Sequence, residues 1–187
     1  MVKKKKINKK SNINMASGQV KQAQPSLLQD VIKLLLKIVC ILLAFVLVFS
    51  FIFGAYRYND LSMTPAVKDG DLVITYRWDK RFLNNDLCVF WYNSDLIVSR
   101  VIAREGDEVD IRANGLYVNG NKIVEDAIKM ETTQVKDAVQ FPLTVPKGFV
   151  FALGDNRDEA VDSRIIGCID VNKTEGKVIG LFRHRGF

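Results

Sequence analysis

The order of apolar and polar positions divides the chain into three parts. Residues 1–29 are rich in Lys, Asn, Ser and Gln and show no apolar periodicity, which predicts a disordered tail. Residues 38–55 form an uncharged run of 18 residues, long enough to cross the hydrocarbon core of a bilayer. We therefore expect a membrane-spanning helix over residues 30–56 and a folded domain over residues 57–187.

Two alternatives fit this apolar run less well. A buried helix of a soluble domain normally has a polar face, whereas this run offers only Ser50. A cleaved signal peptide normally has a shorter apolar core followed by a small-residue cleavage site, and the sequence has no clear site of that kind.

Short β-type runs separated by turn residues follow from residue 60 onward. Asn114-Gly115 and Asn119-Gly120 flank the run at 116–118 and predict tight hairpin turns. The other expected strands cover residues 71–76, 86–92, 96–103, 108–111, 149–153 and 177–182. Residues 126–146 are less regular and are expected to form a flap. Many short strands without a long helix predict an all-β domain of barrel or sandwich type.

Positive charge is concentrated before and at the start of the apolar segment. Residues 1–37 contain nine lysines and a single acidic residue, Asp30, for a net charge of +8, and the remaining residues carry −2. Lysines on one flank of a span favour a cytoplasmic location for that flank. We therefore expect a single-pass protein of the cell membrane with a cytoplasmic N-terminus and an extracellular β domain. Because the basic surplus belongs to the tail, no nucleic-acid partner is expected.

Cysteine and histidine usage indicates neither a metal nor a cofactor. Cys40 lies within the expected span, which leaves Cys88 and Cys168 in the β domain. Both have apolar neighbours, as is typical of core cysteines, and a disulfide between them is the alternative. The histidine content is limited to His184, and no cysteine–histidine spacing typical of a metal site occurs.

Three polar blocks carry the candidate chemistry. The first is Ser62-Met63-Thr64-Pro65, seven residues beyond the apolar run. The second joins Arg100-Val101-Ile102 to Gly106-Asp107, and the third is the charged cluster at 154–164. In this order and at these spacings, the blocks resemble the type I signal peptidases over residues 30–169. The resemblance implies that family's β-fold and a groove that binds exported precursors as an extended strand.

The resemblance assigns Ser62 the role of nucleophile, with Met63 and Pro65 in register around it. A serine hydroxyl is a weak nucleophile and must lose its proton to a base. Ser62 lies within about 23 Å of the apolar run even if the chain between them is fully extended. That position suits a protease whose cleaved bond emerges beside the bilayer.

The family's general base is a lysine immediately before the arginine of the second block. Arg100 is kept here, but Ser99 occupies the position of the lysine. A serine cannot accept a proton near neutral pH, whereas a lysine whose pKa is lowered by burial can. Six further lysines of the domain have polar sequence neighbours, which are typical of charged and solvated side chains: Lys68, Lys80, Lys122, Lys129, Lys136 and Lys147.

Two further positions depart from the family pattern. The third block matches the family at Asp155, Asp162, Ser163 and Arg164. However, Ala160 replaces a serine whose hydroxyl contacts the base lysine in the family. Asp60 stands two residues before Ser62, where many members have Ser or Gly, and a carboxylate there would repel an oxyanion. The resemblance implies that Asp162 and Arg164 support the site as an ion pair, whether or not the site is catalytic.

We expect a member of this family with impaired or absent proteolysis that still binds exported polypeptides. Degenerate relatives of this kind are associated with pilus assembly in Gram-positive bacteria, which adds pilin subunits to the expected partners. The main alternative is a working signal peptidase, a serine endopeptidase with Ser62 as nucleophile and an unrecognised base. A third hypothesis is an accessory subunit of a secretion or sortase complex, in which the anchor and the basic tail matter more than the groove.

Overall fold

The computed structural model describes residues 27–125, 128 and 130–183. Helix α1 (Leu27–Ile52) has 26 residues and is long and apolar enough to cross a membrane. It ends before the predicted boundary at residue 56, because the next residues pair with a neighbouring strand as β1 (Phe53–Arg57). Residues 1–26 of the predicted tail lie outside the described residues.

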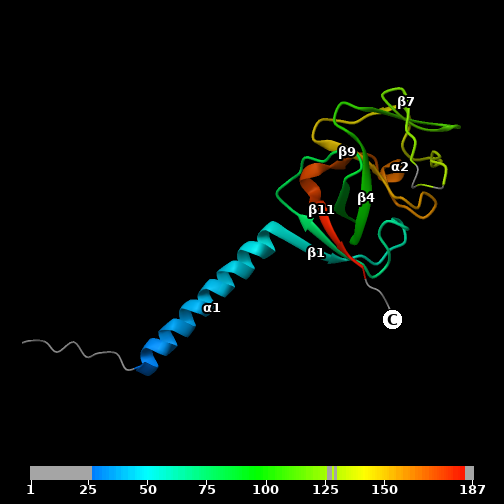
Figure 1. Cartoon of the computed structure of the whole chain (residues 1–187). Helices are drawn as coiled ribbons and strands as arrows, with labels where there is room; N and C mark the ends of the chain where they lie inside the picture. Colours follow the sequence, from blue (N-terminus) through cyan, green and yellow to red (C-terminus); the bar gives the residue numbers. More distant parts are fainter. Residues whose placement is uncertain (1–26, 126–127, 129, 184–187) are drawn as a thin grey trace, which may run out of the picture. The chain divides into compact units, whose positions relative to one another are not determined.

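In the described part of the chain, the larger sheet has seven antiparallel strands (Figure 1). Their spatial order is β1, β2 (Leu72–Tyr76), β11 (Thr174–Phe182), β3 (Leu87–Tyr92), β4 (Asp95–Arg104), β9 (Phe149–Leu153) and β10 (Ile169–Asp170). The late strand β11 thus lies between β2 and β3, while β1 lies at an edge. An edge strand presents backbone N–H and C=O groups that another extended chain can pair with.

The smaller sheet, as far as the chain is described, has four antiparallel strands in the order β7 (Asn121–Lys122), β6 (Gly115–Val118), β5 (Glu108–Arg112) and β8 (Leu143–Thr144). A two-residue turn lies at each end of β6. The first consists of Ala113 and Asn114 and not of the predicted pair Asn114-Gly115, because Gly115 already pairs with Arg112 as the first residue of β6. In the second turn φ is 51° at Asn119 and 77° at Gly120, as a type I′ turn requires. Two short helical turns complete the domain: α2 (Ser163–Ile166) and the 3₁₀ helix η1 (Val171–Lys173).

Side chains of both sheets share one buried cluster. The cluster includes Ile102, Ala103, Val109, Ile111, Leu116, Val118, Val145, Phe151 and Leu153. Val109 and Ile111 alternate along β5 with the less buried Glu108 and Asp110, as a strand with one face in the core requires. The prediction of an all-β domain after an N-terminal apolar helix is therefore confirmed.

A second buried cluster anchors the loop between β1 and β2. The loop contributes Tyr58, Met63 and Val67, all with no exposed surface. They pack on Val73, Val89 and Val98 from β2, β3 and β4. Ser62 lies within this loop, and its neighbours in the loop are held in place by packing against three strands.

Candidate active site

Ser62 is buried and hydrogen-bonded within its own loop. Its Oγ lies 2.8 Å from the phenol oxygen of Tyr58, four residues earlier. The amide N–H of Met63 donates to the same phenol oxygen over 3.1 Å. Tyr58 is not among the site residues predicted from the sequence, although an aromatic residue followed by the polar pair Asn59-Asp60 was an available signal. The Tyr58 phenol therefore binds both the side chain of Ser62 and the backbone of the next residue, Met63.

The protonation state of Tyr58 decides what this contact can do. Burial raises the pKa of Tyr58 from 10.0 to about 12; the Ser62 hydrogen bond opposes the increase and the charge of Asp60 adds to it. At pH 7 the phenolate is therefore present in only about one molecule in 10⁵. A neutral phenol does not take a proton from a serine, so Tyr58 positions Ser62 without activating it.

The charged cluster at 154–164 packs directly on the Ser62 loop. The N–H of Asn156 donates to the backbone oxygen of Ser62 over 2.9 Å, and the N–H of Asp155 donates to the Met63 sulfur over 3.4 Å. A Cβ at Gly154 would lie 2.7 Å from the Ser62 oxygen and would also collide with the Ala160 methyl group. Glycine is therefore required at this close approach, and the first and third sequence blocks meet in space.

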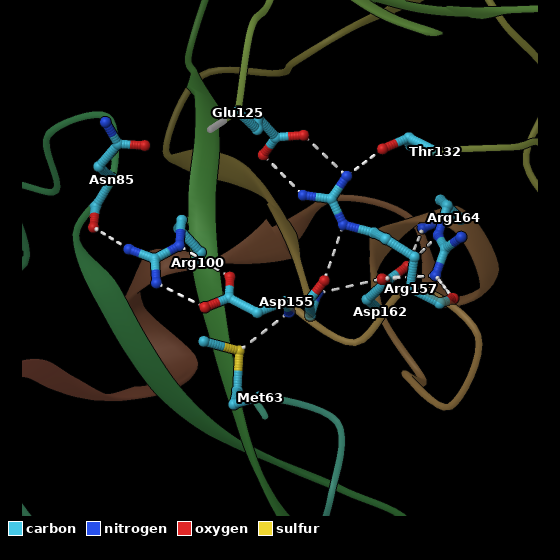
Figure 2. Close-up of polar contacts among 10 residues, drawn as sticks. Met63, Asn85, Arg100, Glu125, Thr132, Asp155, Arg157, Asp162 and Arg164 are labelled. Carbon is cyan, nitrogen blue, oxygen red and sulfur yellow. Dashed lines mark hydrogen bonds and ion pairs between the residues drawn. The ribbon is translucent and has the colours of Figure 1, made fainter. Parts of the chain in front are cut away.

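Two ion pairs hold the cluster in shape, Arg100–Asp155, which is partly buried, and Arg164–Asp162, which is buried (Figure 2). Arg100 on β4 donates to both carboxylate oxygens of Asp155, over 2.8 and 2.6 Å. Arg164 donates to both oxygens of Asp162, over 2.9 and 3.0 Å. Asp162 also accepts from the backbone N–H groups of Arg164 and Gly154. Bidentate pairs of this kind fix the direction of both side chains, so β4 and the cluster are joined rigidly.

Arg157 forms a third ion pair, which the sequence analysis did not predict. It donates to both oxygens of Glu125, over 2.8 and 2.6 Å, and to the Thr132 hydroxyl (Figure 2). Its Nε donates to the Gly154 oxygen over 2.8 Å, and its side chain has no exposed surface. The pair ties the irregular segment between β7 and β8 to the cluster beside Ser62. Arg157 stands in the recognised block, but Glu125 lies 32 residues earlier in a segment without a pattern.

Ser99 lies in β4, opposite Cys88 of β3. Ser99 is 1% exposed, and its Oγ has no hydrogen-bond partner within the described residues. Burial also raises the pKa of the Cys88 thiol to about 12, so that this neighbour is protonated at neutral pH. Ala160 is buried as well and presents a methyl group where the family has a hydroxyl. None of these three side chains can take a proton from Ser62 near pH 7.

Lys80 differs from its sequence-based description as a solvated lysine. It is partly buried, and this burial lowers its pKa. Its ammonium group donates to the backbone oxygen and the hydroxyl of Thr174 on β11. It lines a cavity with Phe149 and Val171, and that cavity is separate from the one beside Asp60. Lys80 is therefore bound elsewhere and does not supply a base for Ser62. His184 and Lys129 lie outside the described residues.

An open groove of about 670 Å³ lies beside Asp60. Its lining includes Ala55, Tyr56 and Arg57 of β1 and Asp95, Leu96 and Ile97 of β4. The Asp60 carboxylate accepts from the Leu61 N–H over 2.6 Å, so it remains at the start of the Ser62 loop. Among the described residues, no group of three or more His, Cys, Asp or Glu is arranged to hold a metal ion.

The remaining predicted positions have structural contacts. The Ser163 hydroxyl accepts from the Ala152 N–H over 3.0 Å and thereby joins the start of α2 to β9. Pro65 follows Thr64 through a cis peptide bond. Both residues therefore shape the backbone on which the site stands.

Comparison with known proteins identifies the family. A family model for "Signal peptidase, peptidase S26" matches residues 31–182. The chain is 35% identical over 162 residues to signal peptidase IB of Staphylococcus aureus, covering 75% of this chain and 85% of that protein. It is 32% identical over 151 residues to signal peptidase I of Bacillus licheniformis, covering 74% and 81%. The solved structure of a signal peptidase I from Enterococcus faecalis V583 shares 30% identity at a TM-score of 0.46, covering 52% of this chain and 96% of that one.

The chain belongs to the signal peptidase family, peptidase S26. The resemblance to type I signal peptidases is thereby confirmed. Membership in this family implies exported precursor proteins as substrates, and together with α1 it indicates a membrane-anchored protein.

Proposed function

We propose that this protein binds exported polypeptides at the outer face of the cell membrane and cleaves them poorly or not at all. The observation that carries the proposal is the buried Ser99 hydroxyl at the position of the family's base lysine. Loss of general base catalysis costs about 10²–10⁴ in rate. Tyr58, the side chain that contacts Ser62, has a pKa too high to replace the base.

Peptide binding needs neither a nucleophile nor a base. The groove beside Asp60 is bordered by β1, an edge strand of the larger sheet. An extended peptide can add to such an edge through main-chain hydrogen bonds, while its alternate side chains enter the groove. Binding of this kind would retain the family's substrate class while the chemistry is lost.

The anchor and the charge distribution support the placement of the groove outside the cell. The nine lysines before and within the start of α1 favour a cytoplasmic N-terminus. The β domain, from residue 57 onward, would then meet polypeptides as they leave the membrane. By resemblance to degenerate relatives, pilin subunits are the proposed cargo in addition to other exported precursors.

The second candidate is an active signal peptidase with Ser62 as nucleophile. It is favoured by the retained Ser62 loop and by the identity to two proteins named as signal peptidases. This candidate requires a base other than Ser99. It also requires Asp60 to be tolerated beside the developing oxyanion.

One experiment separates the two candidates. The full-length protein in detergent micelles is mixed with a signal-peptide-bearing precursor, and cleavage and binding are measured for the wild type, Ser62→Ala, Ser99→Lys and Ser99→Met. The proposal expects binding without cleavage by the wild type and by Ser62→Ala. Burial at position 99 would lower the pKa of an introduced lysine, so Ser99→Lys is expected to gain cleavage.

The methionine variant is the matched control, because it supplies a long side chain without an amine. Cleavage by the wild type that disappears in Ser62→Ala would overturn the proposal in favour of the active enzyme. Absence of both binding and cleavage would instead favour the accessory-subunit hypothesis.

A further inference from the structure

Two aromatic side chains form part of the lining of the groove. Tyr56 belongs to β1 and Trp91 to β3, and both line the same cavity as Asp60. Their ring centroids lie 6.4 Å apart at an interplanar angle of 79°, an edge-to-face arrangement. Trp91 is 52% exposed, so much of its indole is open to a ligand.

Glu175 on β11 holds both aromatic side chains in place. Tyr56 donates its phenol proton to one Glu175 oxygen over 2.5 Å, and the Trp91 indole N–H donates to the other over 3.1 Å. Arg77 donates to the Tyr56 phenol over 2.7 Å and lies 3.6 Å from the Glu175 carboxylate. The polar ends of both rings are thus anchored, and the Glu175 charge is balanced by Arg77.

The charged residues that line the groove are predominantly acidic. Asp60, Asp95 and Glu159 contribute three carboxylates, against the single guanidinium of Arg57. The formal charge of the lining is therefore −2. Asp95 and Glu159 are exposed; Asp95 stands on β4 and Glu159 belongs to the charged cluster at 154–164. The groove thus combines an anchored aromatic pair with uncompensated negative charge.

We propose that the groove selects polypeptide segments that place a lysine or arginine side chain between these carboxylates and the exposed indole. The inference rests on the proposed binding function and specifies the ligand of that same groove. A cation is attracted to an aromatic face and to carboxylates, and both lie in one cavity here. An apolar side chain gains only the aromatic contact, and an acidic side chain is repelled.

The test uses short, uncharged, alanine-rich peptides in which one position at a time is lysine, norleucine or glutamate. Norleucine has nearly the length of lysine without its charge. Binding of fluorescent peptides to the full-length protein in micelles is followed by anisotropy. Lysine is expected to bind about three- to tenfold more tightly than norleucine at one position, and glutamate most weakly. High salt should reduce the preference, because the carboxylates are exposed.

Variants assign the preference to the groove. Asp95→Asn combined with Glu159→Gln removes two of the three carboxylates, so it should weaken lysine binding more than norleucine binding and thereby reduce the lysine preference. Glu175→Gln should weaken binding of both peptides and change the fluorescence of Trp91, read in a Trp78→Phe background. Asp110→Asn is the control, since Asp110 pairs with Arg112 on the smaller sheet.

Equal or tighter binding of norleucine at every position would overturn the inference while leaving the proposed binding function intact. A lysine preference that is undiminished in the double variant would also overturn it. If no peptide binds, the proposed function itself fails, and the inference fails with it.

Discussion

The phenol oxygen of Tyr58 lies 2.8 Å from the hydroxyl of Ser62 and also accepts the backbone N–H of Met63. The serine that the family uses as a nucleophile is therefore held by a hydrogen bond to the neutral phenol of Tyr58. This contact satisfies a buried hydroxyl that has no amine partner among the described residues, and it makes Tyr58 a structural element of the loop.

Replacement of Tyr58 by phenylalanine should destabilise the protein. Two buried groups, the Ser62 hydroxyl and the Met63 N–H, would lose their partner, which costs about 1–3 kcal/mol of unfolding free energy. Tyr117→Phe is the matched control, because the Tyr117 phenol only accepts from the exposed Asn114 amide. Urea unfolding of both variants measures the difference, and equal small effects would contradict a structural role for Tyr58.

Alkaline pH should destabilise the protein through the same phenol. The folded-state pKa of Tyr58 is raised to about 12, above its value of 10.0 without burial. The stability from the neutral phenol is therefore fully present below pH 10 and is lost as the pH rises through 12. The thiol pKa of Cys88 is also raised to about 12, so its ionisation adds a further loss of folding stability at alkaline pH.

Melting temperatures of the wild type and Tyr58→Phe between pH 8 and 12 measure this effect. The variant should lose less stability across the range, because it lacks the Tyr58 component and keeps those of Tyr56, Cys88 and Cys168, whose pKa values are also raised. Parallel curves for the two proteins would show that Tyr58 does not titrate as described.

Gly154→Ala should disturb the Ser62 loop. The new Cβ would lie 2.7 Å from the Ser62 backbone oxygen, so either the loop or the cluster must move. A forced movement of this kind typically costs about 1–3 kcal/mol. Gly180→Ala is the control, because a Cβ there meets only the Ile74 Cβ at 3.9 Å. Chemical unfolding should show a lower unfolding free energy for Gly154→Ala than for Gly180→Ala. Equal unfolding free energies would argue against the close approach of Gly154 to the Ser62 oxygen.

Arg157→Ala should be among the most destabilising single changes in the domain. It removes a fully buried guanidinium and leaves the Glu125 carboxylate without its bidentate partner. Breaking a buried pair costs about 3–5 kcal/mol. Arg112→Ala, at the largely exposed pair with Asp110, should cost no more than about 1 kcal/mol.

Limited proteolysis adds a local readout for the same variant. The segment that Glu125 and Thr132 tie to the cluster should become more accessible in Arg157→Ala than in Arg112→Ala. Equal protection of that segment in both variants would mean that the ion pair does not hold it.

The two cysteines of the β domain should behave as free thiols of different accessibility. Cys88 is fully buried with a raised thiol pKa, and Cys168 is partly buried with a thiol pKa raised by burial. Alkylation followed by mass spectrometry should label Cys168 slowly in the native protein and Cys88 only after unfolding. A mass two daltons low, restored by reduction, would instead reveal the disulfide that the sequence leaves open.

Local sequence patterns predicted the parts of this structure that depend on local interactions. The run at 149–153 is β9, and the run at 96–103 lies within β4, because short, largely apolar runs bounded by turn residues are typical of strands buried in a core. The boundary between α1 and β1 was missed because Phe53 and its neighbours continue the apolar run. Their strand conformation comes from pairing with β2, which no local pattern records.

Most of the site features that could not be predicted from the sequence depend on contacts between residues far apart in the chain. The Ser62 motif and the charged cluster could be recognised, but their meeting depends on bonds between residues more than 90 positions apart. The partner of Arg157 is a lone glutamate in an irregular segment. Tyr58 is the exception, since it lies four residues from Ser62 and only its role was overlooked.

Burial of Ser99 has a consequence for the balance between stability and activity. A lysine at a position that is 1% exposed must lose its hydration, and this disfavours its charged form. A small hydroxyl at that position avoids most of that penalty. A serine in place of the family's base lysine therefore relieves the fold of a destabilising group, and Ser99→Lys should lower the melting temperature. Under the proposed function, the loss of cleavage and a gain in folding stability are two results of one replacement.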